Sequence, residues 1–306
     1  MLIEKIQLWH DSDHAILHSY VTENSLEFQT DLLRPAIIIC PGGGYIGTSD
    51  REAEPVALRF AALGFHAFVL RYTTYYSGLV LDPNNLPTPN MNSAYPQPLF
   101  DLAKAMLIIK ENASKWLVDA EKIVTCGFSA GGHLAASLSV HWNSDLLKEK
   151  FNVNAEMFKP NSVILGYPVL DYQLMKEKVD LEGNADIKRL RKLSNKALFG
   201  ISDPSPLQIS ELSPVNYISS ETPPVFIWHT ADDNVVYVEN SLRFATELSR
   251  NNIPFELHVF QSGVHGLSLC DETTAGEPNH INAECGVWVD LANNWLKKQF
   301  AIDKGR

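Results

Sequence analysis

Short apolar runs alternate with segments of helical periodicity along most of this chain. The runs are rich in β-branched and aromatic residues and end at glycine, proline or charged residues, as buried strands do. In the segments between or after them, apolar side chains recur every three to four positions, which is typical of amphipathic helices. The predicted strands are 35–40, 66–72, 122–127, 162–169, 224–229 and 255–260, and the predicted helices are 54–65, 98–117, 130–142, 239–250 and about 284–300.

This alternation predicts an α/β fold. Buried strands that are connected by helices form a parallel sheet whose two faces are both covered. Residues 1–34 contain short alternating pieces such as AILHSYV, which are consistent with an antiparallel hairpin ahead of the parallel strands. We therefore expect a single domain over 1–306, with a mostly parallel eight-stranded sheet and helices on both faces.

Two long stretches interrupt the alternation. Residues 73–97 are rich in proline, asparagine and tyrosine, and residues 171–222 are mostly polar with one helical patch near 187–199. Both stretches follow predicted strands, so they emerge at the carboxyl edge of the sheet, where open α/β folds bind their ligands. We interpret them as cap-like insertions around a site rather than as separate domains.

The sequence GFSAG, residues 127–131, lies at a strand-to-helix junction and matches the pattern G-x-S-x-G. A strand that turns sharply into a helix crowds its neighbours, and glycines two positions before and after Ser129 relieve that crowding. The serine hydroxyl is then held above the sheet edge as a candidate nucleophile, beside the first amides of the new helix. The alternative is that Ser129 only caps the helix.

A serine hydroxyl is a weak nucleophile until a base takes its proton, so a histidine and a carboxylate are expected at the ends of later strands. Asp232 and Asp233 follow one such strand, and His265 follows the last one. The order serine, aspartate, histidine is that of the α/β-hydrolase fold. His133, on the helix after the serine, is interpreted as a packing or capping residue. No histidine pair has zinc spacing, so we expect neither a metal nor a cofactor.

The strand at 35–40 ends in Pro41 and three glycines. Without Cβ atoms, such a turn lets the backbone approach a substrate and direct amide groups at a developing negative charge. The amides of Gly43 or Gly44, together with that of Ala130, are therefore candidate donors of an oxyanion hole. The alternative is an ordinary glycine-rich turn, whereas a phosphate-binding loop is excluded because no lysine follows at the required place.

These motifs resemble those of the bacterial acetyl-esterase and xylan-esterase-like branch of the α/β-hydrolases, which includes proteins labelled sugar hydrolases. The resemblance is carried by CPGGGY, YPQPLFDLAKAM, CGFSAGGHLA, SPVNYI, HTADDNVVYVENS and SGVHGLSL, between about 35 and 270. It implies a metal-free serine esterase that acts on short acyl esters, often acetyl groups on sugars. It also assigns the acid to Asp233. The chain differs from the family pattern at Pro41 and Tyr237.

A substrate of this kind is a small ester, such as an acetylated sugar or xylo-oligosaccharide. Aromatic faces pack well on sugar rings, so Tyr45, Tyr75, Tyr76 and Tyr95 are candidate substrate-binding residues. The alternative is that these tyrosines anchor the long loop at 73–97. Two other functions are open at this point, an amidase or peptidase on the same fold and a non-catalytic α/β-hydrolase that only binds ligands.

Charge and cysteine content restrict the binding partners and the cellular compartment that we expect. A net charge of −11 and a pI of about 5.4 disfavour nucleic acid and anionic membranes as partners, because both need a basic face. No apolar run approaches the roughly 20 residues that span a bilayer, and the N-terminus lacks the pattern of a signal peptide. We expect a cytoplasmic protein with four free cysteines, and the sequence leaves open whether it forms a homo-oligomer.

Overall fold

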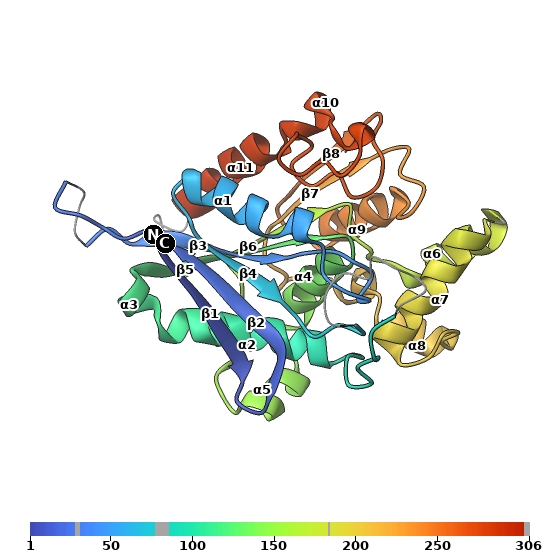
Figure 1. Ribbon diagram of the computed structural model, residues 1–306, viewed down its shortest axis with the longest axis horizontal. Coiled ribbons are helices and arrows are strands. Elements are labelled where there is room, and N and C mark those ends of the chain that lie inside the picture. Colours follow the sequence, from blue (N-terminus) through green and yellow to red (C-terminus); the bar gives the residue numbers. More distant parts are fainter. Residues whose placement is uncertain (28–30, 77–85, 183, 303–306) are drawn as a thin grey trace.

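An eight-stranded sheet forms the centre of the computed structural model, which describes residues 1–27, 31–76, 86–182 and 184–302 (Figure 1). The strand order is β1-β2-β4-β3-β5-β6-β7-β8. β2 is antiparallel to both β1 and β4, and all other neighbours are parallel. The predicted sheet and N-terminal hairpin are therefore confirmed. The strands are β1 (Leu2–Trp9), β2 (Ser12–Val21), β3 (Arg34–Cys40), β4 (His66–Arg71), β5 (Val118–Phe128), β6 (Ser162–Gly166), β7 (Val225–Thr230) and β8 (Phe255–Phe260).

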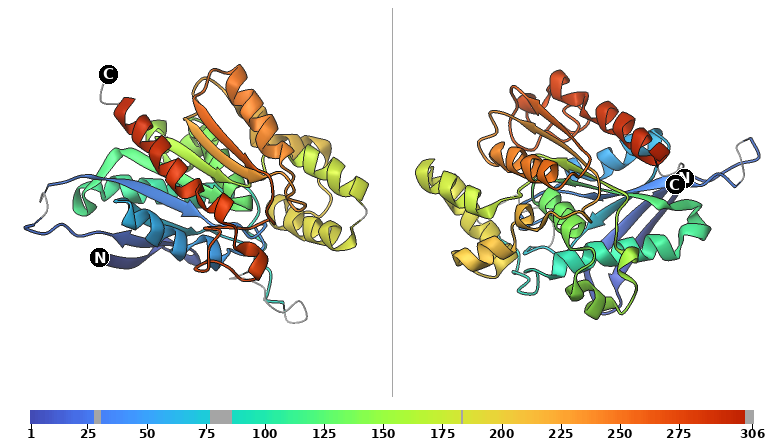
Figure 2. Two further views of the ribbon diagram at one scale, coloured as in Figure 1. Left: turned by 90° about the horizontal axis from the view of Figure 1, so that it is seen from above. Right: turned by 180° about the vertical axis from the view of Figure 1, so that it is seen from behind.

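Helices cover both faces of the sheet, with α1 and α11 on one face and α2, α4 and α9 on the other (Figures 1 and 2). The helices in the described chain are α1 (Glu54–Ala62), α2 (Gln97–Glu111), α3 (Ala113–Trp116), α4 (Ser129–His141), α5 (Asp145–Phe151), α6 (Tyr172–Glu182), α7 (Ala185–Phe199), α8 (Pro206–Glu211), α9 (Glu239–Arg250), α10 (Ala283–Gly286) and α11 (Trp288–Ile302). Short 3₁₀ turns are η1 (Asp50–Glu52), η2 (Ala155–Met157), η3 (Pro214–Tyr217) and η4 (Pro278–His280).

The central strands are buried on both faces. In β3, Ile37 and Ile39 belong to the same apolar cluster as residues of α1 and α11, whereas Ile38 packs in the cluster that contains residues of α2 and α4. Successive side chains of a strand point to opposite faces, so a strand covered on both sides needs a continuous apolar run. This is why the central strands read as uninterrupted apolar segments in the sequence.

The two insertions meet at the carboxyl end of the parallel strands. The Tyr95 amide in the first insertion donates to the Leu198 carbonyl in the second at 2.8 Å. Helices α6, α7 and α8, called the cap from here on, lie beyond that end of the sheet (Figure 2). The expected position of both insertions around one site agrees with this arrangement. Residues 77–85 of the first insertion lie outside the described residues.

The cap contains more helix than the sequence pattern predicted. We expected one helical patch near 187–199, and α7 covers it, but α6 and α8 are helical as well. The sequence of α6, YQLMKEKVDLE, is mostly polar, and only a few of its side chains, such as Leu174, Met175 and Val179, are buried. So short an apolar stripe is a weak signal in the sequence, and the helix gains its stability from packing on the rest of the protein.

Candidate active site

The strand-to-helix turn at Ser129 is constrained by its neighbours. Strand β5 ends at Phe128, α4 begins at Ser129, and Ser129 has a φ of 52°, a left-handed conformation that is rare for residues other than glycine. A Cβ on Gly127 would lie 2.1 Å from the Gly131 carbonyl oxygen, and a Cβ on Gly131 would lie 2.0 Å from the Cys40 carbonyl oxygen. Both positions therefore require glycine, and the serine is held in a strained conformation.

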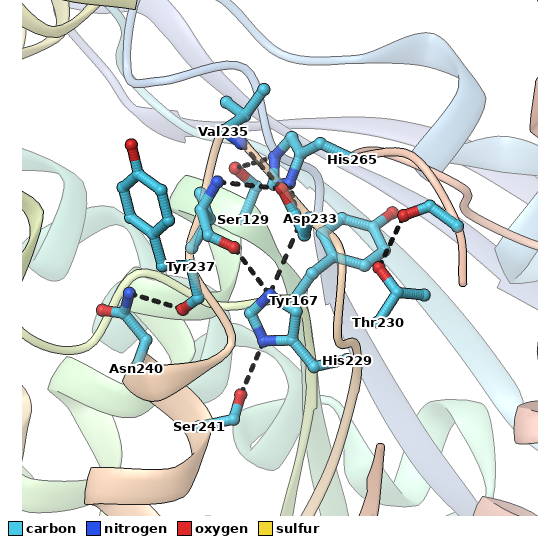
Figure 3. A network of polar contacts seen from close by, with 12 residues as sticks. Ser129, Tyr167, His229, Thr230, Asp233, Val235, Tyr237, Asn240, Ser241 and His265 are labelled. Carbon is cyan, nitrogen blue, oxygen red and sulfur yellow. Dashed lines mark hydrogen bonds and ion pairs between the residues drawn. The ribbon is translucent and has the colours of Figure 1, made fainter. Parts of the chain in front are cut away.

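The structure brings together the three side chains that the sequence singled out (Figure 3). His265 Nε2 lies 2.9 Å from Ser129 Oγ, and His265 Nδ1 lies 2.7 Å from Asp233 Oδ2. The serine follows β5, the aspartate follows β7 and the histidine follows β8, so three parallel strands deliver them to one edge of the sheet. With Nδ1 protonated, the imidazole donates to Asp233 and its Nε2 can accept the serine proton.

Asp233, and not Asp232, contacts the imidazole. Asp233 is buried, and its Oδ1 accepts hydrogen bonds from the amides of Val235 and Val236 at 2.9 Å and 3.0 Å. Asp232 is exposed, and its carboxylate accepts instead from the amide of Gly263 at 2.7 Å. The geometry therefore agrees with the assignment of the acid to Asp233.

His229 is a second partner of Asp233 that sequence reasoning did not assign. It is fully buried at the end of β7, and its Nε2 lies 3.4 Å from Asp233 Oδ2 and 2.8 Å from the carbonyl oxygen of Val236. Its Nδ1 lies 2.8 Å from Ser241 Oγ. The carboxylate is thus oriented by two histidines and two amides, which fixes the direction in which it faces His265 (Figure 3).

Asp233 and His265 stabilise each other's charged forms. Burial alone would raise the pKa of Asp233, but the charge of His265 and the hydrogen bonds from His229 and His265 lower it below its ordinary range. Burial alone would lower the pKa of His265, but the charge of Asp233 and its hydrogen bond raise it. The site is therefore suited to hold an imidazolium, the form that His265 takes after it accepts a proton.

The glycine turn after β3 offers free amides beside Ser129. The amide of Gly42 is occupied, since it donates to Glu52 Oε2 at 2.7 Å. In the described part of the chain, neither Gly43 nor Gly44 donates its amide to another protein group, and their φ angles of 126° and 63° favour glycine. Ala130 lies in the first turn of α4, where amides have no partner within the helix. All three candidate oxyanion donors thus remain available to a ligand.

The candidate substrate-binding tyrosines are mostly buried. Tyr45, Tyr75 and Tyr76 are 1%, 3% and 4% exposed and belong to an apolar cluster. The Tyr45 hydroxyl lies 2.6 Å from His133 Nδ1, which agrees with the packing role expected for that histidine. This burial favours the alternative that these three residues anchor the loop. Tyr95 is half-buried, and its role in substrate binding stays a prediction.

A comparison with protein families decides where this chain belongs. The model of the BD-FAE family matches residues 26–248. The chain belongs to the BD-FAE family. Members of this family are esterases with the α/β-hydrolase fold, so the predicted fold and enzyme class are confirmed at the family level.

Relatives of this BD-FAE chain include proteins whose names refer to xylan. Endo-1,4-beta-xylanase B of Butyrivibrio fibrisolvens is 35% identical over 269 residues, which are 87% of this chain and 38% of that protein. Acetylxylan esterase of Xylanibacter ruminicola is 26% identical over 237 residues, 76% of this chain and 41% of that protein. The chain therefore spans less than half the length of both. The crystal structure of an acetyl ester-xyloside bifunctional hydrolase from Caldicellulosiruptor lactoaceticus is 31% identical, with a TM-score of 0.73 and 96% of each chain covered.

Two more residues of this BD-FAE chain border the site and were not predicted, Glu52 and Tyr167. Their carboxylate and hydroxyl are 2.7 Å apart, although 115 positions separate them in the sequence. No local pattern marks either residue, because a lone glutamate after a glycine turn and a tyrosine after a strand are common. Only the tertiary fold brings η1 close to the residue that follows β6.

The described residues contain no group of three or more histidine, cysteine or acidic side chains that could hold a metal ion. Cys40, Cys126, Cys270 and Cys285 are all buried and free. Within the same described ranges, no helix is both long and apolar enough to cross a membrane.

Proposed function

We propose that this protein is a serine carboxylesterase that hydrolyses short-chain acyl esters, in the first place acetyl esters of sugars or xylo-oligosaccharides. The observation that carries the proposal is the hydrogen-bonded chain of Ser129, His265 and Asp233 at a strained strand-to-helix turn. The BD-FAE membership supports ester hydrolysis. Acetylated xylan fragments are suggested by relatives named a xylanase, an acetylxylan esterase and an acetyl ester-xyloside hydrolase.

The proposed reaction has two steps, and the geometry of the site supports both. Ser129 Oγ attacks the ester carbonyl carbon while its proton passes to His265 Nε2, and the charge on the carbonyl oxygen is met by the amides of Ala130 and of Gly43 or Gly44. His265 then gives the proton to the departing alcohol. A water molecule attacks the acyl-enzyme by the same route and releases the acid. Asp233 orients the imidazole and stabilises its protonated form throughout.

The surroundings of the site favour a short acyl group. A Cβ on Gly44 would lie 3.5 Å from Ser194 Oγ of α7, so the cap stands directly over the glycine turn. The cap insertion is mostly charged and polar, as in MKEKVDLEGNADIKRLRK, and the apolar side chains of α7, such as Ile187, Leu193 and Leu198, pack against the apolar core. A groove for a long acyl chain would gain roughly 0.8 kcal/mol for each buried methylene group, and such a groove needs apolar walls.

A labelling experiment and a substrate series test the proposal. A fluorophosphonate probe is expected to label wild-type protein at Ser129 and to leave Ser129→Ala unlabelled, with both proteins equally folded by circular dichroism. For p-nitrophenyl esters of two to eight carbons, kcat/KM is expected to fall with acyl length, and acetylated xylo-oligosaccharides are expected to be deacetylated. Labelling at another serine would refute the nucleophile. An optimum at eight carbons would refute the acetyl preference, and faster cleavage of matched anilides would show an amidase.

A further inference from the structure

A buried carboxylate lies beside the serine turn. Glu52 is the last residue of η1, and only 4% of its surface is exposed. A Cβ on Gly42 would lie 2.7 Å from Glu52 Oε2 and 3.0 Å from the Cβ of Ser129, so one glycine separates the carboxylate from the serine. Burying a carboxylate is costly unless hydrogen bonds or a positive charge replace the lost water. The burial of the Glu52 carboxylate beside the serine therefore needs an explanation.

Each oxygen of this carboxylate binds a different part of the site. Oε2 accepts from the amide of Gly42, the first glycine of the turn that carries the oxyanion donors, at 2.7 Å. Oε1 accepts from the hydroxyl of Tyr167, also at 2.7 Å. The carbonyl of Gly42 accepts in turn from the amide of Ser49 at 2.9 Å. Glu52 thus fixes the start of the oxyanion turn.

Tyr167 extends this contact to His265. Its hydroxyl oxygen accepts from the amide of Ser268 at 2.9 Å, and Ser268 belongs to the same loop as His265. Its ring packs edge-on against the imidazole, with ring centroids 5.0 Å apart (Figure 3). Through Tyr167, Glu52 therefore supports the histidine loop as well as the oxyanion turn.

Glu52 forms no ion pair with a described residue, so no direct contact neutralises its charge. Among the described residues, no lysine, arginine or histidine nitrogen pairs with it within 4.0 Å, and the adjacent Arg51 donates to the carbonyl of Thr274. Burial lowers the pKa of His265, and Asp233 and then Glu52 raise it. The other charged or titratable groups around the imidazole are His229, which acts through Asp233, the phenol of Tyr167, and Arg51 near Gly266.

We propose that Glu52 is a positioning residue for acyl transfer, which holds the oxyanion turn and Tyr167 in place and whose negative charge favours the imidazolium at His265. The inference rests on the proposed function and deepens it. When the Ser129 proton moves to His265 Nε2 and the new bond to the acyl carbon forms, one positive charge appears on the imidazole. Glu52 stabilises that charge without touching the substrate or taking the proton.

The test replaces the charge and keeps the shape. In Glu52→Gln, we expect kcat for p-nitrophenyl acetate to fall about tenfold with little change in KM. The acidic limb of the kcat/KM profile is expected to move about one unit to lower pH, because loss of a nearby opposite charge lowers the pKa of His265. The pKa of His265, measured by NMR, should move by the same amount. An unchanged limb and an unchanged His265 titration in Glu52→Gln would overturn the proposal.

Two further variants separate charge from shape. Asp50→Asn removes a carboxylate from the same turn at an exposed position, and we expect it to leave kcat and the acidic limb unchanged. Glu52→Asp keeps the charge but shortens its reach, so kcat should fall while the limb stays in place. Equal limb shifts in Glu52→Asp and Glu52→Gln would overturn the role of the charge. If Glu52→Gln does not fold, a Glu52→Asp variant with wild-type kcat would overturn the positioning role.

The two proposals fail on different observations. The NMR titration of His265 needs no turnover, so it measures the influence of Glu52 even if no ester is hydrolysed. The proposed function fails when wild-type protein neither reacts with the fluorophosphonate at Ser129 nor cleaves any ester of the series.

Discussion

The turn at 127–131 carries Ser129 and the cap lies over the neighbouring glycine turn, but different forces hold these two regions in place. At the turn, a Cβ on Gly131 would lie 2.0 Å from a backbone oxygen of the neighbouring strand, so sterics leave a single arrangement. The cap is attached by scattered contacts, such as the ion pair between Lys178 of α6 and Glu239 of α9. His133 Nε2 and the Leu212 carbonyl oxygen, 2.7 Å apart, add another.

Under the proposed function, this difference suits the two regions to different tasks. Acyl transfer needs atoms held to within a fraction of an ångström. A backbone that sterics restrict to a single conformation provides that precision. Recognition of the alcohol part of an ester tolerates looser support, and polar helices docked on the scaffold can change without disturbing the chemistry. Changes at the turn and its partners should therefore cost far more than changes in the cap.

The largest effect is expected for Asp233, the acid that orients His265 beside the serine turn. Asp233→Asn should lower kcat by about 10⁴, or about 5.5 kcal/mol, because the amide no longer holds the imidazole in the tautomer that accepts the serine proton. Asp232→Asn is the matched control and should cost little, since Asp232 is exposed and its carboxylate accepts from the Gly263 amide on the histidine loop. Steady-state kinetics of both variants would show the reverse order if the loop register were one residue different.

A smaller but still large effect is expected for the turn itself. Gly131→Ala should lower the free energy of unfolding by about 3 kcal/mol or more, since the new methyl group would overlap the carbonyl oxygens of Cys40 and Pro41. Gly286→Ala is the control, because a Cβ there would find its nearest neighbour at 3.6 Å. Urea unfolding of the two variants measures the difference. Equal stability of both would show that the turn relaxes more easily than its geometry indicates.

An intermediate effect is expected where the glycine turn meets the cap. Tyr45→Phe leaves the buried nitrogen of His133 without its partner, so it should lower the free energy of unfolding by about 2 kcal/mol. The KM for acetylated xylo-oligosaccharides should stay near the wild-type value, because the ring is buried. Thermal unfolding and kinetics check the two parts separately. A higher KM at unchanged stability would restore Tyr45 as a substrate-binding residue.

The smallest effect is expected within the cap. Ser205 Oγ accepts from the Gln208 amide, and the Gln208 side chain accepts from the Ser205 amide, which together cap α8. Ser205→Ala should cost about 1 kcal/mol of unfolding free energy and leave kcat for p-nitrophenyl acetate unchanged. Ser144→Ala is the control, since Ser144 precedes α5 without a capping hydrogen bond from its side chain. A large loss of kcat in Ser205→Ala would mean that the cap takes part in the chemistry.

Local sequence patterns were sufficient to predict much of the fold and the serine turn. The strands and main helices follow from hydrophobic periodicity, and α9 begins and ends at the predicted residues 239 and 250. The serine turn follows from the G-x-S-x-G pattern because its crowding arises between neighbours in the chain. The same local signals failed at α6. Its few apolar residues give only a weak helical pattern, and the helix is stabilised by packing against the rest of the protein.

By itself, the sequence determined the alternation of strands and helices, the serine at its turn, the histidine after the last strand and a pair of adjacent aspartates. Only the tertiary structure decided that Tyr45, Tyr75 and Tyr76 are buried and that Glu52 lies beside the serine, whereas the choice of Asp233 was already implied by the family resemblance and agrees with the geometry. The physical reason is distance along the chain. Periodicity and sterics act between near neighbours, whereas burial and hydrogen bonds such as that from Tyr167 to Glu52 join residues that meet only after the sheet has formed.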